Sequence, residues 1–355
     1  MSSRNISSSK VHRSTKPIRP DYSMMSNDLR LAFDIGHPTM TELLQKLKVD
    51  FVEEEKSSRS RHIPPQEVRR VLEYRGYKFH STERGRGLVY SFMICKGGTG
   101  KSTSARFVSQ RLSSMGARCL VIDADPQGNL TASFSLNKYD YKIDEKTPVI
   151  LDVLEKKFKL EDILIKVTPH LDLVPSTLVN STMENEILKS KNPAEVLREH
   201  LEPLLPNYDY CIIDCAPALN RTNLAMIAAS DTVVLPVNPD MFSKIGLDQT
   251  LGEILEIEKQ FAKQGLKVEK RVLYSKFDAR ETTSLRYLSE IAKDREDLLY
   301  KTVVKASADV KNAIANDVDL FSINKSQAKS DYDALTREIM GFDAGLKIKR
   351  RQPEG

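Results

Sequence analysis

The sequence predicts an α/β fold, in which a mostly parallel central sheet carries helices on both faces and a small helical unit precedes it. Apolar runs of strand length recur from position 88 onward, and segments with helical periodicity lie between them. A glycine-rich octapeptide, KGGTGKST at 96–103, follows the first apolar run and precedes a helix. A strand, a glycine-rich loop and a helix in this order are typical of a phosphate-binding loop.

The individual elements follow from the spacing of apolar residues. The first strand is expected over 89–95, and the helix after the loop has Ala105, Val108, Leu112 and Met115 on one face and a glycine stop at Gly116. Further strands are expected at 118–123, 171–174, 210–214, 232–237, 271–275 and 299–304. Alternating strands and helices predict a parallel sheet that is covered on both faces.

The glycine-rich loop has the chemistry of an ATP site. Its glycines let the backbone turn N–H groups toward phosphate oxygens, and the following helix adds its positive end. Lys101 would reach the β- and γ-phosphates, the Ser102 hydroxyl would bind Mg²⁺, and Thr103 would hold the α-phosphate. The candidate nucleotide-binding residues are Gly97, Gly98, Thr99, Gly100, Lys101, Ser102 and Thr103.

The loop departs from the general phosphate-loop pattern at two positions. That pattern requires a glycine at position 95, where this chain has Cys95, and a second lysine, Lys96, begins the loop. This two-lysine loop resembles the deviant Walker A motif of the ParA/MinD class of ATPases. The resemblance implies a deviant P-loop NTPase in which Lys96 reaches across an ATP-bound homodimer to the other subunit's phosphates. Lys96 and Lys101 are therefore candidate catalytic residues.

Two further segments supply carboxylates. The stretch 123–129, DADPQGN, resembles the second motif of ParA proteins, and the apolar run 210–214 delivers Asp214 as a Walker B strand does. Asp123 and Asp214, together with Ser102, are the candidate Mg²⁺ ligands, because Mg²⁺ prefers oxygen donors. By resemblance, Asp125 would position the attacking water and is the third candidate catalytic residue.

The resemblance covers about 250 residues, from 89 to 339, and it favours ParA over its relatives. The DPQGN sequence is similar to that of ParA proteins, and the C-terminal segment 345–355 has too few apolar residues for the membrane helix of MinD proteins. The four cysteines lie in or beside expected core strands without a C-x-x-C pair, which argues against an iron–sulfur site and for reduced, inert thiols.

The small unit at 31–86 has two expected helices, at 39–49 and 65–74. One interpretation is a helix-turn-helix that reads operator DNA, similar to the N-terminal unit of larger plasmid ParA proteins. The cations Arg69, Arg70, Arg75 and Lys78 around the second helix favour this interpretation. The alternative is a helical collar that packs on the ATPase.

The charge is concentrated at the chain ends. Residues 1–30 hold six Lys or Arg and two Asp, and residues 345–355 hold four Lys or Arg and one Glu. We expect a disordered basic tail at 1–30, the ATPase domain at 87–342 and a basic tail at 343–355. Polyanion contact and mere solubility are equally good explanations of the tails. No apolar signal or membrane-spanning run is present, so a cytoplasmic protein without membrane contact is expected. Association with the nucleoid is what the resemblance to ParA implies.

The resemblance implies a plasmid or chromosome partitioning ATPase with ATP and Mg²⁺ as cofactors. It would dimerise on ATP, bind nonspecific DNA as a dimer, and hydrolyse ATP weakly until a ParB-like centromere-binding partner stimulates it. The candidate DNA contacts are Arg280, Arg286, Lys305 and Lys311. The alternatives are an ATP-regulated operator-binding repressor and a ParA-like positioning ATPase for a cargo other than DNA.

Overall fold

The computed structural model describes residues 16–19, 21–52, 62–190, 192–278, 280–323 and 325–342. The expected C-terminal basic tail at 343–355 and most of the expected N-terminal tail lie outside these residues. Within the described part of the chain, no helix is long and apolar enough to cross a membrane.

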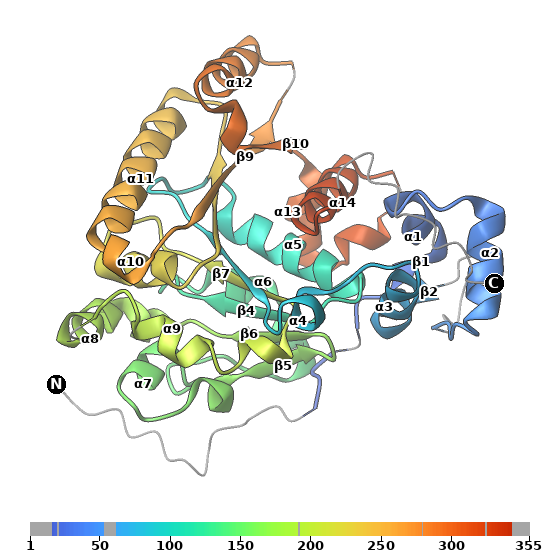
Figure 1. The fold of residues 1–355 in the computed structure, drawn as a ribbon, viewed down its shortest axis with the longest axis horizontal. Helices are drawn as coiled ribbons and strands as arrows, with labels where there is room; N and C mark the ends of the chain where they lie inside the picture. The colour runs from blue at the N-terminus through green and yellow to red at the C-terminus, as the bar shows by residue number, and fades with distance from the viewer. Residues whose placement is uncertain are drawn as a thin grey trace.

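An eight-stranded sheet forms the centre of the molecule, in the order β10-β9-β8-β3-β7-β4-β6-β5 (Figure 1). All neighbouring strands are parallel except β5, which runs antiparallel to β6 at the edge. The strands are β3 (Leu88–Phe92), β4 (Cys119–Asp123), β5 (Ile165–Thr168), β6 (Leu171–Val174), β7 (Tyr210–Asp214), β8 (Thr232–Val237), β9 (Glu269–Phe277) and β10 (Leu299–Lys305). The predicted α/β fold and every predicted strand are confirmed, and β5 is an additional strand.

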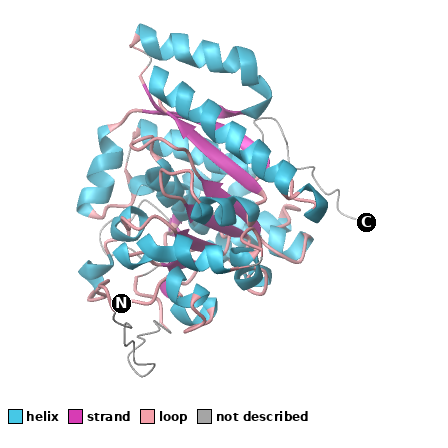
Figure 2. Cartoon of the chain, turned by 90° about the vertical axis from the view of Figure 1, so that its left-hand side faces the viewer, coloured by secondary structure: helices cyan, strands magenta, loops and turns pink. Residues whose placement is uncertain are grey.

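Helices cover both faces of the sheet, as Figure 2 shows. The first face carries α5 (Lys101–Ser114), α6 (Asn129–Ser133), α13 (Ala308–Asn316) and α14 (Gln327–Ile339). The second face carries α7 (Ile150–Leu154), α8 (Met183–Lys189), α9 (Val196–Leu201), α10 (Arg221–Ala228), α11 (Met241–Gln260) and α12 (Thr282–Arg295). Successive residues of one strand serve opposite faces: Ile212 belongs to the first core and Ile213 to the second. A strand that is buried on both faces is apolar along its whole length, and such continuous apolar runs allowed these strands to be predicted from the sequence.

The N-terminal unit contains a small sheet that the sequence did not signal. Its elements are β1 (Met24–Met25), α1 (Ser26–Ala32), α2 (His37–Lys46), β2 (His62–Ile63), α3 (Pro65–Tyr74) and α4 (His80–Glu83). β1 pairs antiparallel with β2, and Val52 bridges the other side of β2. The two expected helices correspond to α2 and α3, and strand β2 of the small sheet lies between them in the sequence. Ordered structure also begins before the expected boundary at residue 30, because Met24 and Leu29 are fully buried in the first core.

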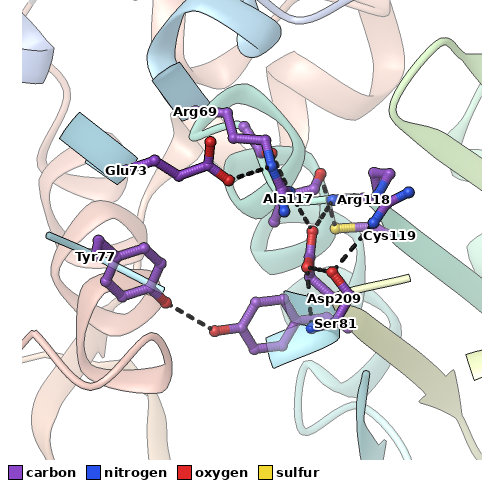
Figure 3. A network of polar contacts seen from close by, with 10 residues as sticks. Arg69, Glu73, Tyr77, Ser81, Ala117, Arg118, Cys119 and Asp209 are labelled. Carbon is purple, nitrogen blue, oxygen red and sulfur yellow. Dashed lines mark hydrogen bonds and ion pairs between the residues drawn. The ribbon is translucent and has the colours of Figure 1, made fainter. Parts of the chain in front are cut away.

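The unit is joined to the central sheet through the buried carboxylate of Asp209, just before β7 (Figure 3). Arg69 Nη1 of α3 donates to Asp209 Oδ2 at 2.7 Å, the Arg118 backbone N–H donates to the same oxygen at 2.8 Å, and Ser81 donates to Oδ1. Although burial acts to raise it, these hydrogen bonds hold the pKa of Asp209 below its usual value. The N-terminal unit therefore shares a charged contact with the sheet as well as an apolar core.

The end of α5 is shaped to receive α3. Gly116 has a left-handed φ of 89°, and a Cβ there would lie 2.7 Å from both the backbone nitrogen of Arg69 and the carbonyl oxygen of Pro65. Only glycine fits this close approach. The helix stop that the sequence predicted is thus also the place where the N-terminal unit contacts the helix of the phosphate loop.

Candidate nucleotide site

The phosphate loop connects the end of β3 to the start of α5, at the carboxyl edge of the sheet where open α/β sheets bind ligands. Gly98 and Gly100 adopt left-handed conformations, with φ of 74° and 91°. These values allow the tight turn that directs backbone N–H groups inward. Ser102 and Thr103 lie in the first turn of α5, beside its positive end.

Lys101 lies inside the loop. Its side chain is almost fully buried, and Nζ donates to the Lys96 carbonyl oxygen at 3.2 Å. Burial lowers the pKa of Lys101, and the nearby Asp214 carboxylate opposes that shift. Among the described residues, the Lys96 carbonyl oxygen is the hydrogen-bond partner of this ammonium. An ammonium has three donors, so others remain for phosphate oxygens.

Lys96 has a different environment. Its Nζ lies 2.6 and 2.7 Å from the two carboxylate oxygens of Asp240 and 3.1 Å from Ser243 Oγ. Asp240 is the N-cap of α11 and accepts from the Ser243 backbone N–H at 2.8 Å. Although burial acts to raise it, the hydrogen bonds from Lys96 and Ser243 lower the pKa of Asp240. Sequence reasoning missed Asp240; its position directly before a helix was the available signal.

Asp123 and Asp214 end two neighbouring strands and face each other in the register of β4 and β7. Burial, together with the Asp123 charge, raises the pKa of Asp214 well above its usual value, and the groups that oppose this are Ser102 and Lys101. Neither oxygen of Asp214 accepts a hydrogen bond of normal geometry from any described residue. Two buried carboxylates beside a hydroxyl and a phosphate loop fit the oxygen-rich environment that Mg²⁺ prefers.

Asp123 and Asp125 belong to one hydrogen-bonded turn. Asp123 Oδ2 accepts from both the backbone N–H and the hydroxyl of Thr131, each at 2.7 Å, and Asp123 Oδ1 accepts from the Asp125 N–H at 3.2 Å. Asp125 itself is nearly buried and accepts from the Gln127 N–H at 3.0 Å. The predicted metal ligand and the predicted water-positioning residue are therefore fixed by the same segment. Thr131 was not predicted, because nothing in its sequence context marks it.

The candidate DNA residues lie around the carboxyl ends of β9 and β10, and most already have partners. Arg280 pairs with Asp278, Arg286 lies 3.5 Å from Glu290, and Lys305 lies 4.0 Å from Asp331. Lys311, on α13, is exposed. The side chain of Arg280 is 90% exposed, so its pair with Asp278 is screened by water.

The arginines of α3 are less available than the sequence suggested. Arg69 is bound to Asp209 and to the Gly116 carbonyl oxygen, and its side chain is only 17% exposed. Arg70 pairs with Glu67 and donates to the Leu47 carbonyl oxygen. Both therefore act within the protein in this conformation.

The comparisons with known proteins agree with this geometry. A family described as an AAA domain matches residues 88–268. The sporulation initiation inhibitor protein Soj of Bacillus subtilis (strain 168) is 30% identical over 255 residues, which are 71% of this chain and 98% of Soj. The chromosome partitioning protein ParA of Myxococcus xanthus (strain DK1622) is 30% identical over 276 residues, which are 76% of this chain and 94% of that protein.

A solved structure extends the agreement to the fold. The crystal structure of a plasmid partition protein from Borrelia burgdorferi B31 bound to AMPPNP superposes with a TM-score of 0.61 at 25% identity. The match covers 72% of this chain and 100% of that one. Together these similarities span the phosphate loop, both carboxylate strands and the sheet around them. The chain belongs to the ParA/Soj family of partition-type P-loop ATPases.

Proposed function

We propose that this chain is a partitioning ATPase that binds and hydrolyses Mg-ATP, dimerises on ATP, binds nonspecific DNA as a dimer and responds to a ParB-like partner. The observation that carries the proposal is the phosphate loop with two lysines in different environments, Lys101 inside it and Lys96 held at its rim by Asp240. Lys101 would bind phosphates of its own subunit, and Lys96 would turn toward another subunit once its ion pair with Asp240 breaks.

In the nucleotide site, the N–H groups from Gly97 to Thr103 would hold the phosphates and Lys101 would neutralise the β- and γ-phosphates. Ser102, Asp123 and Asp214 would hold Mg²⁺, which supplies positive charge to the leaving phosphate oxygens. Burial disfavours the ionised form of Asp123 and of Asp214 in the free protein. A bound Mg²⁺ would favour that form through its positive charge. Asp125 would orient the attacking water.

Dimerisation would move Lys96 from Asp240 to the nucleotide of the other subunit. The first turns of α11, beside Lys96, present exposed apolar side chains at Met241, Phe242 and Ile245. Phe242 lies under the Lys96 ammonium, 5.8 Å from ring centroid to Nζ. Exposed apolar side chains grouped beside a charged site suit contact with a second protein surface. ATP would then shift the population toward the dimer because the dimer binds it with more groups.

The test compares two alanine variants. Lys101→Ala removes the buried phosphate cation and is expected to abolish ATP binding. Lys96→Ala is expected to leave binding to the monomer largely intact and to abolish ATP-dependent dimerisation. Fluorescent-nucleotide titration measures the first property and light scattering with and without ATP measures the second. Normal ATP-dependent dimerisation and hydrolysis by Lys96→Ala would overturn the proposed role of the two-lysine loop.

A further inference from the structure

The carboxyl end of β9 is irregular where it reaches the phosphate loop. In the pairing of β9 with β10, Val303 faces Tyr274 and Lys305 faces Phe277, so β9 has one more residue than β10 over this interval. Ser275 and Lys276 therefore lie opposite one residue of β10 and form a β-bulge. Lys276 also has a left-handed backbone, with φ of 54°. Bulges redirect side chains next to functional sites, and a non-glycine residue in this conformation carries strain.

The bulge directs two neighbouring side chains onto the carbonyl groups of the phosphate loop. Lys276 Nζ donates to the Gly98 carbonyl oxygen, which also accepts from Asn238 Nδ2 at 3.4 Å. Ser275 Oγ donates to the Thr99 carbonyl oxygen. Two consecutive peptide groups of the loop are thus held from outside by the ends of β8 and β9.

We propose that Lys276 is a positioning residue of the phosphate loop, whose ammonium holds the Gly98 carbonyl outward and thereby directs the Thr99 N–H into the phosphate site. The physical reason is the trans peptide bond: its C=O and N–H point in opposite directions in one plane, so fixing one fixes the other. Ser275 acts in the same way on the next peptide, whose N–H belongs to Gly100. This inference rests on the proposed nucleotide-binding function and adds a residue to that site.

The surroundings of Lys276 support a role toward the loop. Among the described residues no carboxylate pairs with Lys276, and the Gly98 carbonyl is its hydrogen-bond partner. Partial burial, with smaller contributions from Lys311 and Lys96, lowers the pKa of Lys276. The left-handed backbone and the cationic neighbours both disfavour a lysine at position 276. The hydrogen bond to the Gly98 carbonyl oxygen is the interaction that offsets these costs.

The experiment measures the binding of AMP, ADP and ATP to Lys276→Met, Lys276→Arg and Lys276→Gly. Loss of one charge-assisted hydrogen bond that orders the loop is expected to weaken ADP and ATP binding equally, by about 5- to 30-fold. AMP binding is expected to stay unchanged, because its single phosphate would lie at Thr103, the residue expected to hold the α-phosphate, and not at the Thr99 N–H. Lys276→Arg, which keeps the donor, is expected to retain most of the affinity. Lys263→Met, at an exposed lysine after α11, is the matched control and is expected to bind as wild type.

Lys276→Gly separates positioning from a structural role. Glycine relieves the left-handed strain, so the nucleotide-free variant is expected to melt at the same or a higher temperature while ADP affinity still falls. Wild-type ADP affinity in Lys276→Met overturns the inference. A loss confined to ATP that vanishes in high salt also overturns it, since it would mark a simple counter-ion. A wild-type protein that binds neither ADP nor ATP would contradict the proposed function itself.

Discussion

Asp214 is the residue whose environment is least favourable in the free protein. It is fully buried and faces Asp123, and its pKa is raised by burial and by that neighbour. A carboxyl whose folded pKa is raised binds its proton more tightly in the folded state. Its contribution to stability is therefore present below the unfolded pKa of about 4 and is lost as pH rises through the folded pKa.

The first prediction is that Asp214→Asn stabilises the nucleotide-free protein at pH 8 and has little effect at pH 5, because asparagine resembles the protonated acid. Melting temperatures at both values measure the difference, and each 1 kcal/mol gained corresponds to about 1–2 °C for a chain of this size. Asp294→Asn, at an exposed aspartate of α12, is the control and should shift the melting temperature equally at both pH values. A larger gain at pH 5 than at pH 8 would contradict the argument.

Asp240 is the residue that pairs with Lys96 in this conformation. Asp240→Asn removes the charge but keeps a side chain that caps α11 well. The second prediction is that this variant dimerises at a lower ATP concentration, by about 2- to 5-fold, as expected for a partly exposed ion pair. Asp248→Asn, which breaks the α11 pair with Arg295, is the control. Dimerisation that needs more ATP than in wild type would mean that the Lys96–Asp240 pair is part of the active state.

The candidate site was only partly predictable at the residue level. The loop and the strand ends that carry Asp123, Asp125 and Asp214 were predictable because each of these motifs is a short contiguous stretch of sequence. Asp240, Thr131 and Lys276 were not, because their roles arise from contacts between segments that are distant in the chain, such as Lys276 with Gly98. No local pattern distinguishes such a lysine from any other at a strand end.

At the scale of elements, some strands were predictable from local sequence and others were not. The central strands were predictable because both of their faces are buried. β5 was missed because it is an edge strand of alternating Ile-Lys-Val-Thr character, and β1 and β2 are only two residues long. Helix α3 was predicted from its proline start and periodicity, but its attachment to Asp209 was not, because the two lie 140 positions apart.

That attachment gives the third prediction. Arg69→Met would leave the buried Asp209 without its cationic partner, and removal of one partner from a buried ion pair costs about 3–5 kcal/mol. Arg70→Met, on the same helix but exposed and paired within it, is expected to cost much less. Urea unfolding measures both. The Arg69→Met/Asp209→Asn double variant should recover part of the loss, and an effect of Arg69→Met no larger than that of Arg70→Met would contradict the buried pair.

The pH dependence of this effect has the opposite sign to that of Asp214. The folded pKa of Asp209 is lowered, so its contribution to stability is present above the unfolded pKa of about 4 and is lost as pH falls through the folded value. The difference between wild type and Arg69→Met should therefore shrink in acid. Deletion of residues 1–86 would also remove Arg69 and Ser81 from Asp209. Surface substitutions on α2 thus test operator binding by the N-terminal unit more cleanly than truncation.

At the scale of the whole molecule, the carboxyl ends and the amino ends of the parallel strands carry different groups of residues. The phosphate loop, Asp214 and the candidate DNA residues all lie at or after the carboxyl ends of their strands. Asp209, Arg118 and the contact with α3 lie at the amino ends. Figure 1 shows the N-terminal unit beside α14, on the side of the molecule away from α11. The expected nucleotide site and any DNA contact through α13 would therefore lie at the same ends of the strands.

The last prediction concerns these strand ends and their charge. ATP-dependent DNA binding should show little sequence preference, and the logarithm of affinity should fall linearly with the logarithm of salt, by about 0.9 per phosphate neutralised. Lys311→Ala should reduce the slope by about 0.9 for each subunit whose Lys311 contacts a phosphate, because Lys311 is exposed and each such contact releases a counter-ion from DNA. Arg280→Ala should change the slope less, since Arg280 must first leave Asp278. The measurement is fluorescence anisotropy with a random duplex over a salt series, with Lys263→Ala as the control. A slope that Lys311→Ala leaves unchanged would place the DNA surface elsewhere on the dimer.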